Sequence, residues 1–148
     1  MPGKHRGMTL IELMITLVII AVLVSVAVPS YRQYVLRSHR VEATSALLSI
    51  AAKQEKFYLA CNTYTENLTA AVDEESCADR GLGLPDGDGD VDDLQTENGW
   101  YTISVEANNL TFSLTADAIG SQAADGECAQ FTLDQNGARS ATKDKCWD

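Results

Sequence analysis

The sequence predicts an α+β fold in which a long N-terminal helix packs on an antiparallel β-meander. Three observations predict it. An apolar run of about 21 residues begins at position 8, apolar residues then recur at three- and four-residue steps, and the last third of the chain alternates between apolar and polar residues. The first two patterns are typical of helices and the third of strands. Helix and strands that follow one another along the chain indicate an α+β class.

The first seven residues, MPGKHRG, are polar and carry Lys4 and Arg6. The apolar run that follows, Met8 to Val28, is long enough to span a bilayer as a helix. Cations before such a span predict an N-terminus in the cytoplasm and a C-terminal region outside it. The run is longer than the core of a secretory signal peptide, and no small-residue cleavage pattern follows it. An ordinary single-pass anchor is the other alternative.

Glu12 argues against the ordinary anchor. It lies inside the apolar run, where a carboxylate near the membrane centre costs about 2.5–3.5 kcal/mol and is usually functional. Its place near one end of the run lowers that cost, so a tolerated interfacial acid is the alternative interpretation. The run from Met8 to Val28 has no Lys or Arg. A cationic partner for Glu12 must therefore come from another chain or from a newly made amine.

The GMTLIE stretch at residues 7–12, with the apolar run behind it, resembles the class III signal sequence of type IV pilins. The resemblance implies that a prepilin peptidase cuts between Gly7 and Met8 and methylates the new amine of Met8. It also implies that this amine pairs with Glu12 of a neighbouring subunit in a filament. Phe is the usual first residue of mature pilins, so Met8 departs from the pattern. The glycine and the glutamate are both present.

The helix is expected to run from about Met8 to Leu59, with its first half as the membrane span and its second half on the sheet. Pro29 predicts a kink or local melting near residues 25–29, because proline removes a helical hydrogen bond. Pilins commonly carry a proline at this place. The second half carries one apolar stripe, which is expected to be buried: Val41, Ala43, Leu47, Ile50, Ala51, Phe57 and Tyr58.

These patterns divide the chain into four segments. They are a cleaved leader (1–7), a transmembrane and polymerisation helix (8–30), the amphipathic half of the same helix (31–60) and a disulfide-bonded globular head (61–148). From Val41 onward the chain has 20 acidic and six basic residues, a formal charge of −14. Such a surface keeps a protein soluble and argues against a nucleic-acid partner.

Four cysteines lie in the head, and no histidine does. Widely spaced thiolates make a poor zinc site, whereas two disulfides suit an oxidising compartment. Of the three possible pairings we favour the local one, Cys61–Cys77 with Cys128–Cys146. Loops of that size contribute about 3 kcal/mol each in the chain-entropy model.

An acidic segment stands out in the connection between Cys61 and Glu97, which is otherwise expected to be irregular. Asp86, Asp88, Asp90 and Glu97 approximate the spacing of a calcium-binding loop. Val91 occupies the position at which such a loop needs glycine. A solvated cluster of acidic turns is the alternative interpretation, and no other cofactor is expected.

Three strands are expected after Gly99, at Trp100–Val105, Leu110–Leu114 and Cys128–Leu133, with turns at residues 108–109 and 136–137. The NGWYT…LTFSLTA…CAQFTLDQNGARSA…CW pattern resembles PilE-like minor pilins, which end in a disulfide-bounded region. The chain has no residue pattern for catalysis, so an enzyme is not expected.

The sequence therefore predicts a structural subunit of a type IV pilus, most similar to a minor pilin, supporting pilus biogenesis, adhesion, twitching motility or DNA uptake. Its expected partners are other pilin subunits, the prepilin peptidase, the inner-membrane assembly platform and, before assembly, membrane lipid. It would begin in the inner membrane with its head in the periplasm and end in an extracellular pilus. The alternatives are a major pilin, a pseudopilin of a type II secretion system, and a pilus-borne DNA receptor that uses Arg139, Lys143 and Lys145.

Overall fold

The computed structural model describes residues 8–72, 75–85, 94–143 and 145–147. The chain divides into two compact units, residues 1–35 and 36–148, and each is described by itself. The predicted leader and Gly7 lie outside the described residues, as do Asp86, Asp88 and Asp90 of the acidic segment.

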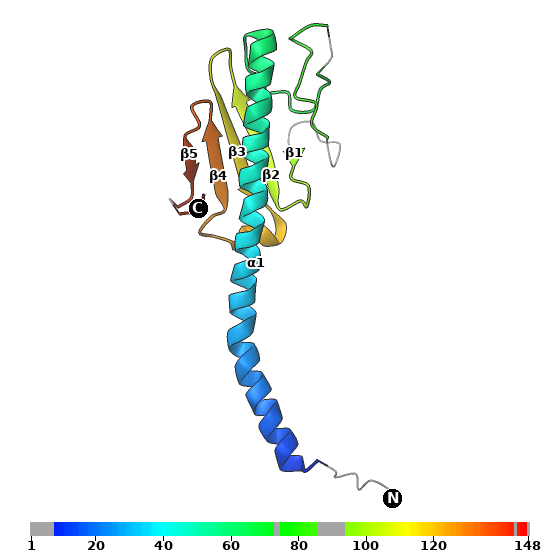
Figure 1. Ribbon diagram of the computed structural model, residues 1–148, viewed down its shortest axis with the longest axis vertical. Helices are drawn as coiled ribbons and strands as arrows, with labels where there is room; N and C mark the ends of the chain where they lie inside the picture. Colours follow the sequence, from blue (N-terminus) through cyan, green and yellow to red (C-terminus); the bar gives the residue numbers. More distant parts are fainter. Residues whose placement is uncertain (1–7, 73–74, 86–93, 144, 148) are drawn as a thin grey trace, which may run out of the picture. The chain divides into compact units, whose positions relative to one another are not determined.

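Helix α1 spans Leu10–Cys61 and contributes to both units (Figure 1). Thr9 caps its first turn, because the Thr9 hydroxyl oxygen accepts a hydrogen bond from the amide of Glu12 at 3.3 Å. The helix continues without a break through Pro29, so residues 25–29 remain helical rather than melting. A bend at Pro29 stays a prediction.

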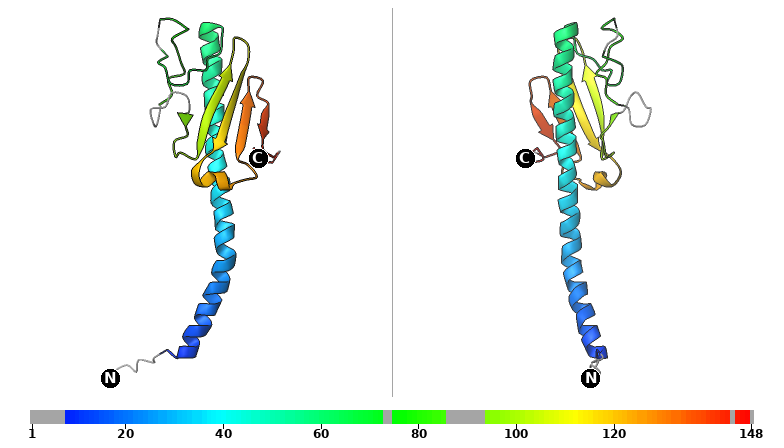
Figure 2. Two further views of the ribbon diagram at one scale, coloured as in Figure 1. Left: turned by 180° about the vertical axis from the view of Figure 1, so that it is seen from behind. Right: turned by 45° about the vertical axis from the view of Figure 1, so that its right-hand side comes forward.

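In the second unit, α1 lies across one face of a five-stranded antiparallel sheet (Figures 1 and 2). The strands follow one another in chain order, which makes the sheet a meander. Their bounds are β1 Leu94–Gln95, β2 Tyr101–Ala107, β3 Phe112–Ala118, β4 Gln130–Asp134 and β5 Arg139–Ala141, with a short 3-10 helix, η1, at Gly120–Ala124.

The three predicted strands overlap β2, β3 and β4, and the predicted turns join β2 to β3 and β4 to β5. Gly137 adopts a φ of 74° in the second turn, a conformation that favours glycine. The edge strands β1 and β5 were not predicted. The expectation that the whole Cys61–Glu97 connection is irregular is wrong, because Leu94 and Gln95 pair with Ile103 and Thr102 of β2.

The core lies between the second half of α1 and the inner face of the sheet. Ala43, Leu47, Ile50 and Phe57 are buried as the apolar stripe predicts. Ala51 and Tyr58 are only partly buried, and Val41 is 66% exposed because it lies on another face of the helix. The sheet contributes buried side chains from its three longest strands: Tyr101, Ile103, Phe112, Leu114, Ala116, Phe131 and Leu133.

Two disulfides close loops at the edges of this core. The sulfur atoms are joined as Cys61–Cys77 and Cys128–Cys146, which is the local arrangement among the three possible ones. The first ties the end of α1 to the loop that follows it. The second ties the start of β4 to the C-terminal segment. Each constrains the unfolded chain more than the folded one and so stabilises the fold.

Candidate functional site

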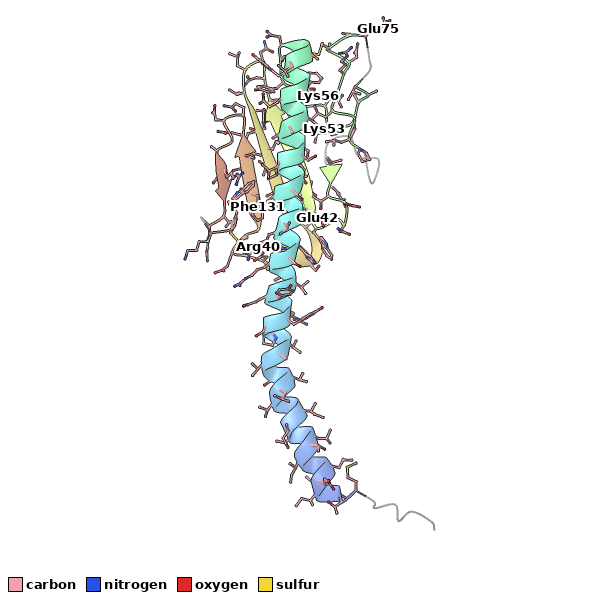
Figure 3. The ribbon with its side chains drawn as sticks, viewed as in Figure 1. Arg40, Glu42, Lys53, Lys56, Glu75 and Phe131 are labelled. Atoms are coloured by element: carbon pink, nitrogen blue, oxygen red, sulfur yellow. A yellow bond between two sulfur atoms is a disulfide. The ribbon has the colours of Figure 1, made fainter. Side chains whose placement is uncertain are left out.

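The N-terminal part of α1 presents apolar side chains around its whole circumference. From Met8 to Val28 every large apolar side chain is exposed, from 45% at Val28 to 77% at Leu10. Figure 3 shows side chains projecting from this part of the helix. The segment is long and apolar enough to cross a membrane. A surface of this kind is stable only when lipid or another protein chain covers it.

Glu12 belongs to this apolar surface. It lies in the first turn of α1, four residues after Met8, where its charge interacts favourably with the helix dipole. Among the described residues its carboxylate has no hydrogen bond or ion pair, and the nearest basic residue along the described chain is Arg32. The segment therefore brings one acidic group into an apolar surface without supplying its counter-ion.

A second feature is a polar cluster where α1 meets η1, which sequence reasoning missed. Gln122 is fully buried, and its side-chain amide donates to the Leu36 carbonyl at 3.1 Å and to the Tyr101 hydroxyl at 2.9 Å. The amide oxygen of Gln122 therefore faces His39, whose Nδ1 lies 2.9 Å away and must carry the proton. The His39 ring stacks on Trp100 at a centroid distance of 4.1 Å.

Arg40 completes this polar cluster with a two-pronged ion pair to Asp125. The Arg40 Nε and a terminal nitrogen donate to the two carboxylate oxygens at 2.7 and 2.8 Å, and Asp125 is only 5% exposed. The hydrogen bond to Asp125 raises the pKa of Arg40 despite its partial burial. Burial also raises the pKa of Tyr101 to about 12. The cluster fixes the orientation of α1 against the turn between β3 and β4, a role no motif in the sequence indicates.

A groove of about 560 Å³ gathers cations beside the C-terminal disulfide. Its basic lining residues are Arg37 and Arg40 from α1 with Lys143 and Lys145 from the C-terminal loop. Glu127 also lines the groove and accepts a hydrogen bond from Lys143 at 2.8 Å, which lowers the pKa of Glu127.

The predicted cluster of Arg139, Lys143 and Lys145 is only partly brought together. Lys143 and Lys145 share the groove, whereas the guanidinium of Arg139 lies 5.3 Å from the centre of the Trp147 ring. Arg37 and Arg40 take its place in the groove. Sequence reasoning missed them because they are about 100 residues away along the chain.

Of the predicted calcium ligands, only Glu97 belongs to the described residues, and its side chain is exposed. Within the described parts of the chain, no group of three or more His, Cys, Asp or Glu side chains could hold a metal ion. The calcium prediction for Asp86, Asp88 and Asp90 stays untested.

Two family models match the chain. Residues 2–28 match the "Prokaryotic N-terminal methylation motif", and residues 29–132 match the model described as "Type IV minor pilin ComP, DNA uptake sequence receptor". The two matches follow one another without a gap. The second alone covers well over half of the chain.

Curated relatives are pilins as well. The type IV major pilin protein PilE of Neisseria gonorrhoeae is 29% identical over 106 residues, which is 72% of this chain and 59% of that protein. PilA of Myxococcus xanthus is 35% identical over 63 residues, 43% of this chain and 29% of PilA. FimA of Dichelobacter nodosus is 33% identical over 102 residues, 67% of this chain and 62% of FimA. Each match spans less than two thirds of the relative's length. The chain is a type IV pilin, and it belongs to the family described as type IV minor pilin ComP.

Proposed function

We propose that this pilin is cleaved between Gly7 and Met8 and polymerises through the apolar part of α1. One observation carries the proposal: between Met8 and Val28 the side chains are apolar on all sides of the helix and exposed. The match to an N-terminal methylation motif over residues 2–28 supports processing at this end. Cleavage removes Lys4 and Arg6, the charges that hold the precursor's N-terminus in the cytoplasm.

Glu12 sets the register between subunits in this proposal. The amine that cleavage creates at Met8 is the only cation available near Glu12 in a bundle of these apolar segments. An ion pair between the Met8 amine of one copy and Glu12 of the next stabilises one axial position of a subunit relative to its neighbour. Misplaced copies leave a charge unpaired in an apolar surrounding, which costs about 3–5 kcal/mol.

The proposed partners follow from the same steps. Lipid covers the apolar segment before assembly, a prepilin peptidase cuts and methylates the precursor, and an inner-membrane platform passes the subunit to the growing filament. The precursor has its N-terminus in the cytoplasm and its head in the periplasm, where the two disulfides form. The family match supports a minor rather than a major subunit, although the curated relatives are named as major pilins. A low share of this subunit in sheared filaments is the expected result.

Processing is tested by mass spectrometry of the protein isolated from its host. The expected N-terminus is N-methylated Met8. The same preparation tests Glu12→Ala, which is expected to remain inserted and cleaved but to be at least about tenfold depleted from sheared filaments. Glu106→Ala removes one exposed carboxylate from β2 and serves as the matched control. Protein that retains Lys4 and Arg6, or normal incorporation of Glu12→Ala, would contradict the proposal.

A second candidate function is the reception of DNA during uptake. The description of the matching family and the groove formed by Arg37, Arg40, Lys143 and Lys145 favour it. The formal charge of −14 from Val41 onward opposes it, as do the ion pairs that Asp125 and Glu127 make with Arg40 and Lys143.

DNA reception is tested with Lys143→Glu/Lys145→Glu. If the groove binds a duplex, affinity falls steeply with salt and is lost in this variant. Lys53→Glu/Lys56→Glu changes the net charge equally and is the control. Equal loss in both variants would leave only a general effect of charge.

A further inference from the structure

The stretch of α1 that follows the apolar segment carries positive charge and exposed aromatic rings. Between Pro29 and Val41 the chain has three arginines and one histidine but no acidic residue. Tyr31 and Tyr34 are 69% and 71% exposed, and Arg32 is exposed between them along the helix. We call Tyr31, Arg32 and Tyr34, which all belong to the first unit, the Tyr–Arg cluster.

The charge of Arg32 is not taken up by the protein. Arg40, two turns further along α1, is committed to its ion pair with Asp125. Arg32 has neither a hydrogen bond nor an ion pair with any of the described residues. The chain is described on both sides of the cluster, and the next acidic residue along α1, Glu42, lies about 15 Å further at a rise of 1.5 Å per residue. Arg32 therefore presents an available cation.

The place of the cluster along α1 matches the headgroup layer of a bilayer. The helical part of the apolar run, Leu10 to Val28, is about 28 Å long, close to the ~30 Å thickness of the hydrocarbon core. The three residues of the cluster follow about 5–9 Å beyond Val28, and a headgroup layer is about 5–8 Å thick. With the apolar run in the hydrocarbon core, the cluster reaches the phosphate groups of the lipids.

We propose that Arg32 binds the phosphate group of an anionic phospholipid in the periplasmic leaflet while the precursor is held in the membrane. Arginine donates two parallel hydrogen bonds to phosphate oxygens, and exposed tyrosine rings are stable at the headgroup level. Basic side chains next to a span attract anionic headgroups. The inference rests on the membrane span of the proposed function and names the lipid that the span selects.

Binding is tested by NMR on the ¹⁵N-labelled full chain in phosphatidylcholine bicelles. Phosphatidylglycerol replaces phosphatidylcholine in steps, and the amides of residues 31–34 and the Nε–H group of Arg32 report the contact. These signals are expected to shift and to saturate. Inorganic phosphate is expected to cause no saturable shift, because a soluble anion is not concentrated at the bilayer surface.

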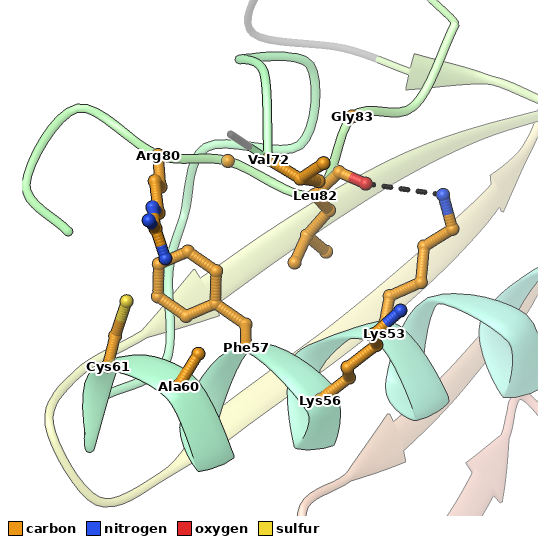
Figure 4. A pocket seen from close by; sticks show the side chains of 10 residues that line it. Lys53, Lys56, Phe57, Ala60, Cys61, Val72, Arg80, Leu82 and Gly83 are labelled. Carbon is orange, nitrogen blue, oxygen red and sulfur yellow. Dashed lines mark hydrogen bonds between the residues drawn. The ribbon is translucent and has the colours of Figure 1, made fainter. Parts of the chain in front are cut away.

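Two variants and a matched control isolate the charge of Arg32. Arg32→Gln is expected to raise the phosphatidylglycerol fraction at half of the shift about fivefold, whereas Arg32→Lys keeps the charge and most of the binding. Lys56→Gln makes the same change in net charge in the second unit and is expected to leave binding unchanged. Lys53 and Lys56 line a groove of about 510 Å³ between the last turns of α1 and the loop that reaches Gly83 (Figure 4).

The span itself is tested separately by washing vesicles that contain the chain with alkaline carbonate. Extraction of the unmodified chain would overturn the membrane step of the proposed function and this inference with it. An inserted chain in which Arg32→Gln and Lys56→Gln bind phosphatidylglycerol equally would overturn the inference alone, as would equal losses in Arg32→Lys and Arg32→Gln. Depletion of Arg32→Gln from filaments with unchanged lipid binding would mean that Arg32 contacts another subunit instead.

Discussion

At the scale of single residues, the polar contacts between α1 and the head are the features that the sequence does not reveal. Gln54 is fully buried within the apolar stripe of α1, because its side-chain amide nitrogen and oxygen bond the carbonyl and the amide of Thr65 at 2.6 and 3.1 Å. Gln122 is buried for the same reason. A burial pattern based on side-chain polarity assigns such residues to solvent, since it cannot foresee which backbone group will meet them.

Glu42 gives a prediction for pH dependence. Partial burial acts to raise its pKa, but hydrogen bonds from Thr96 and from the Asn98 side chain and amide outweigh it, so the pKa lies below its ordinary value.

 A carboxylate with a lowered pKa in the folded state stabilises the fold above its unfolded pKa, and this contribution is lost as the pH falls through the folded pKa. Glu42→Gln is therefore expected to lower the melting temperature at pH 7, and this deficit is expected to shrink as the pH falls below the ordinary glutamate pKa of about 4.3. The measurement is the melting temperature of both proteins between pH 7 and pH 3. Glu106→Gln is the control, and a Glu42→Gln deficit that persists unchanged to pH 3 would contradict the prediction.

At the scale of secondary-structure elements, periodicity predicted the long elements and missed the short ones. The helix and the strands β2, β3 and β4 each contain enough residues for a repeat of three to four or of two positions to be recognised. Strands β1 and β5 have two and three residues, so alternation cannot be read from them. They exist because the neighbouring strands offer backbone groups at the sheet edges, which is a property of the assembled sheet.

The contact between α1 and the loop after it gives a prediction at this scale. Gln54→Leu keeps the size of the side chain but leaves the amide and carbonyl of Thr65 without their partners. Because unsatisfied buried polar groups cost about 1–3 kcal/mol each, we expect the free energy of unfolding to fall by about 2 kcal/mol or more. Urea denaturation of the oxidised protein measures this change. Lys56→Leu, at a nearby exposed position of α1, is the control, and an equally small effect of both substitutions would show that the Thr65 contact is unimportant.

At the scale of the whole molecule, the two compact units have opposite requirements. The second unit has its own buried core and two disulfides, whereas the apolar part of α1 in the first unit consists of exposed side chains. The candidate assembly surface could be predicted from the sequence, because an apolar run with one acid and a preceding glycine is local in the chain. The groove at Lys53 and Lys56 and the groove at Lys143 and Lys145 could not be predicted from the sequence, because each combines residues of α1 with residues much further along the chain.

This division predicts that the second unit folds without the apolar segment. A variant lacking residues 1–28 retains Pro29 and the turn before Leu36, whose carbonyl bonds Gln122, and proline is well tolerated at the start of a helix. Secreted to the periplasm so that both disulfides form, it is expected to be monomeric without detergent. Its urea midpoint should match that of the full chain in micelles, because none of the core residues is removed. Analytical ultracentrifugation and urea denaturation measure the two properties. An aggregated or unfolded variant would mean that the apolar segment is needed for folding as well as for assembly.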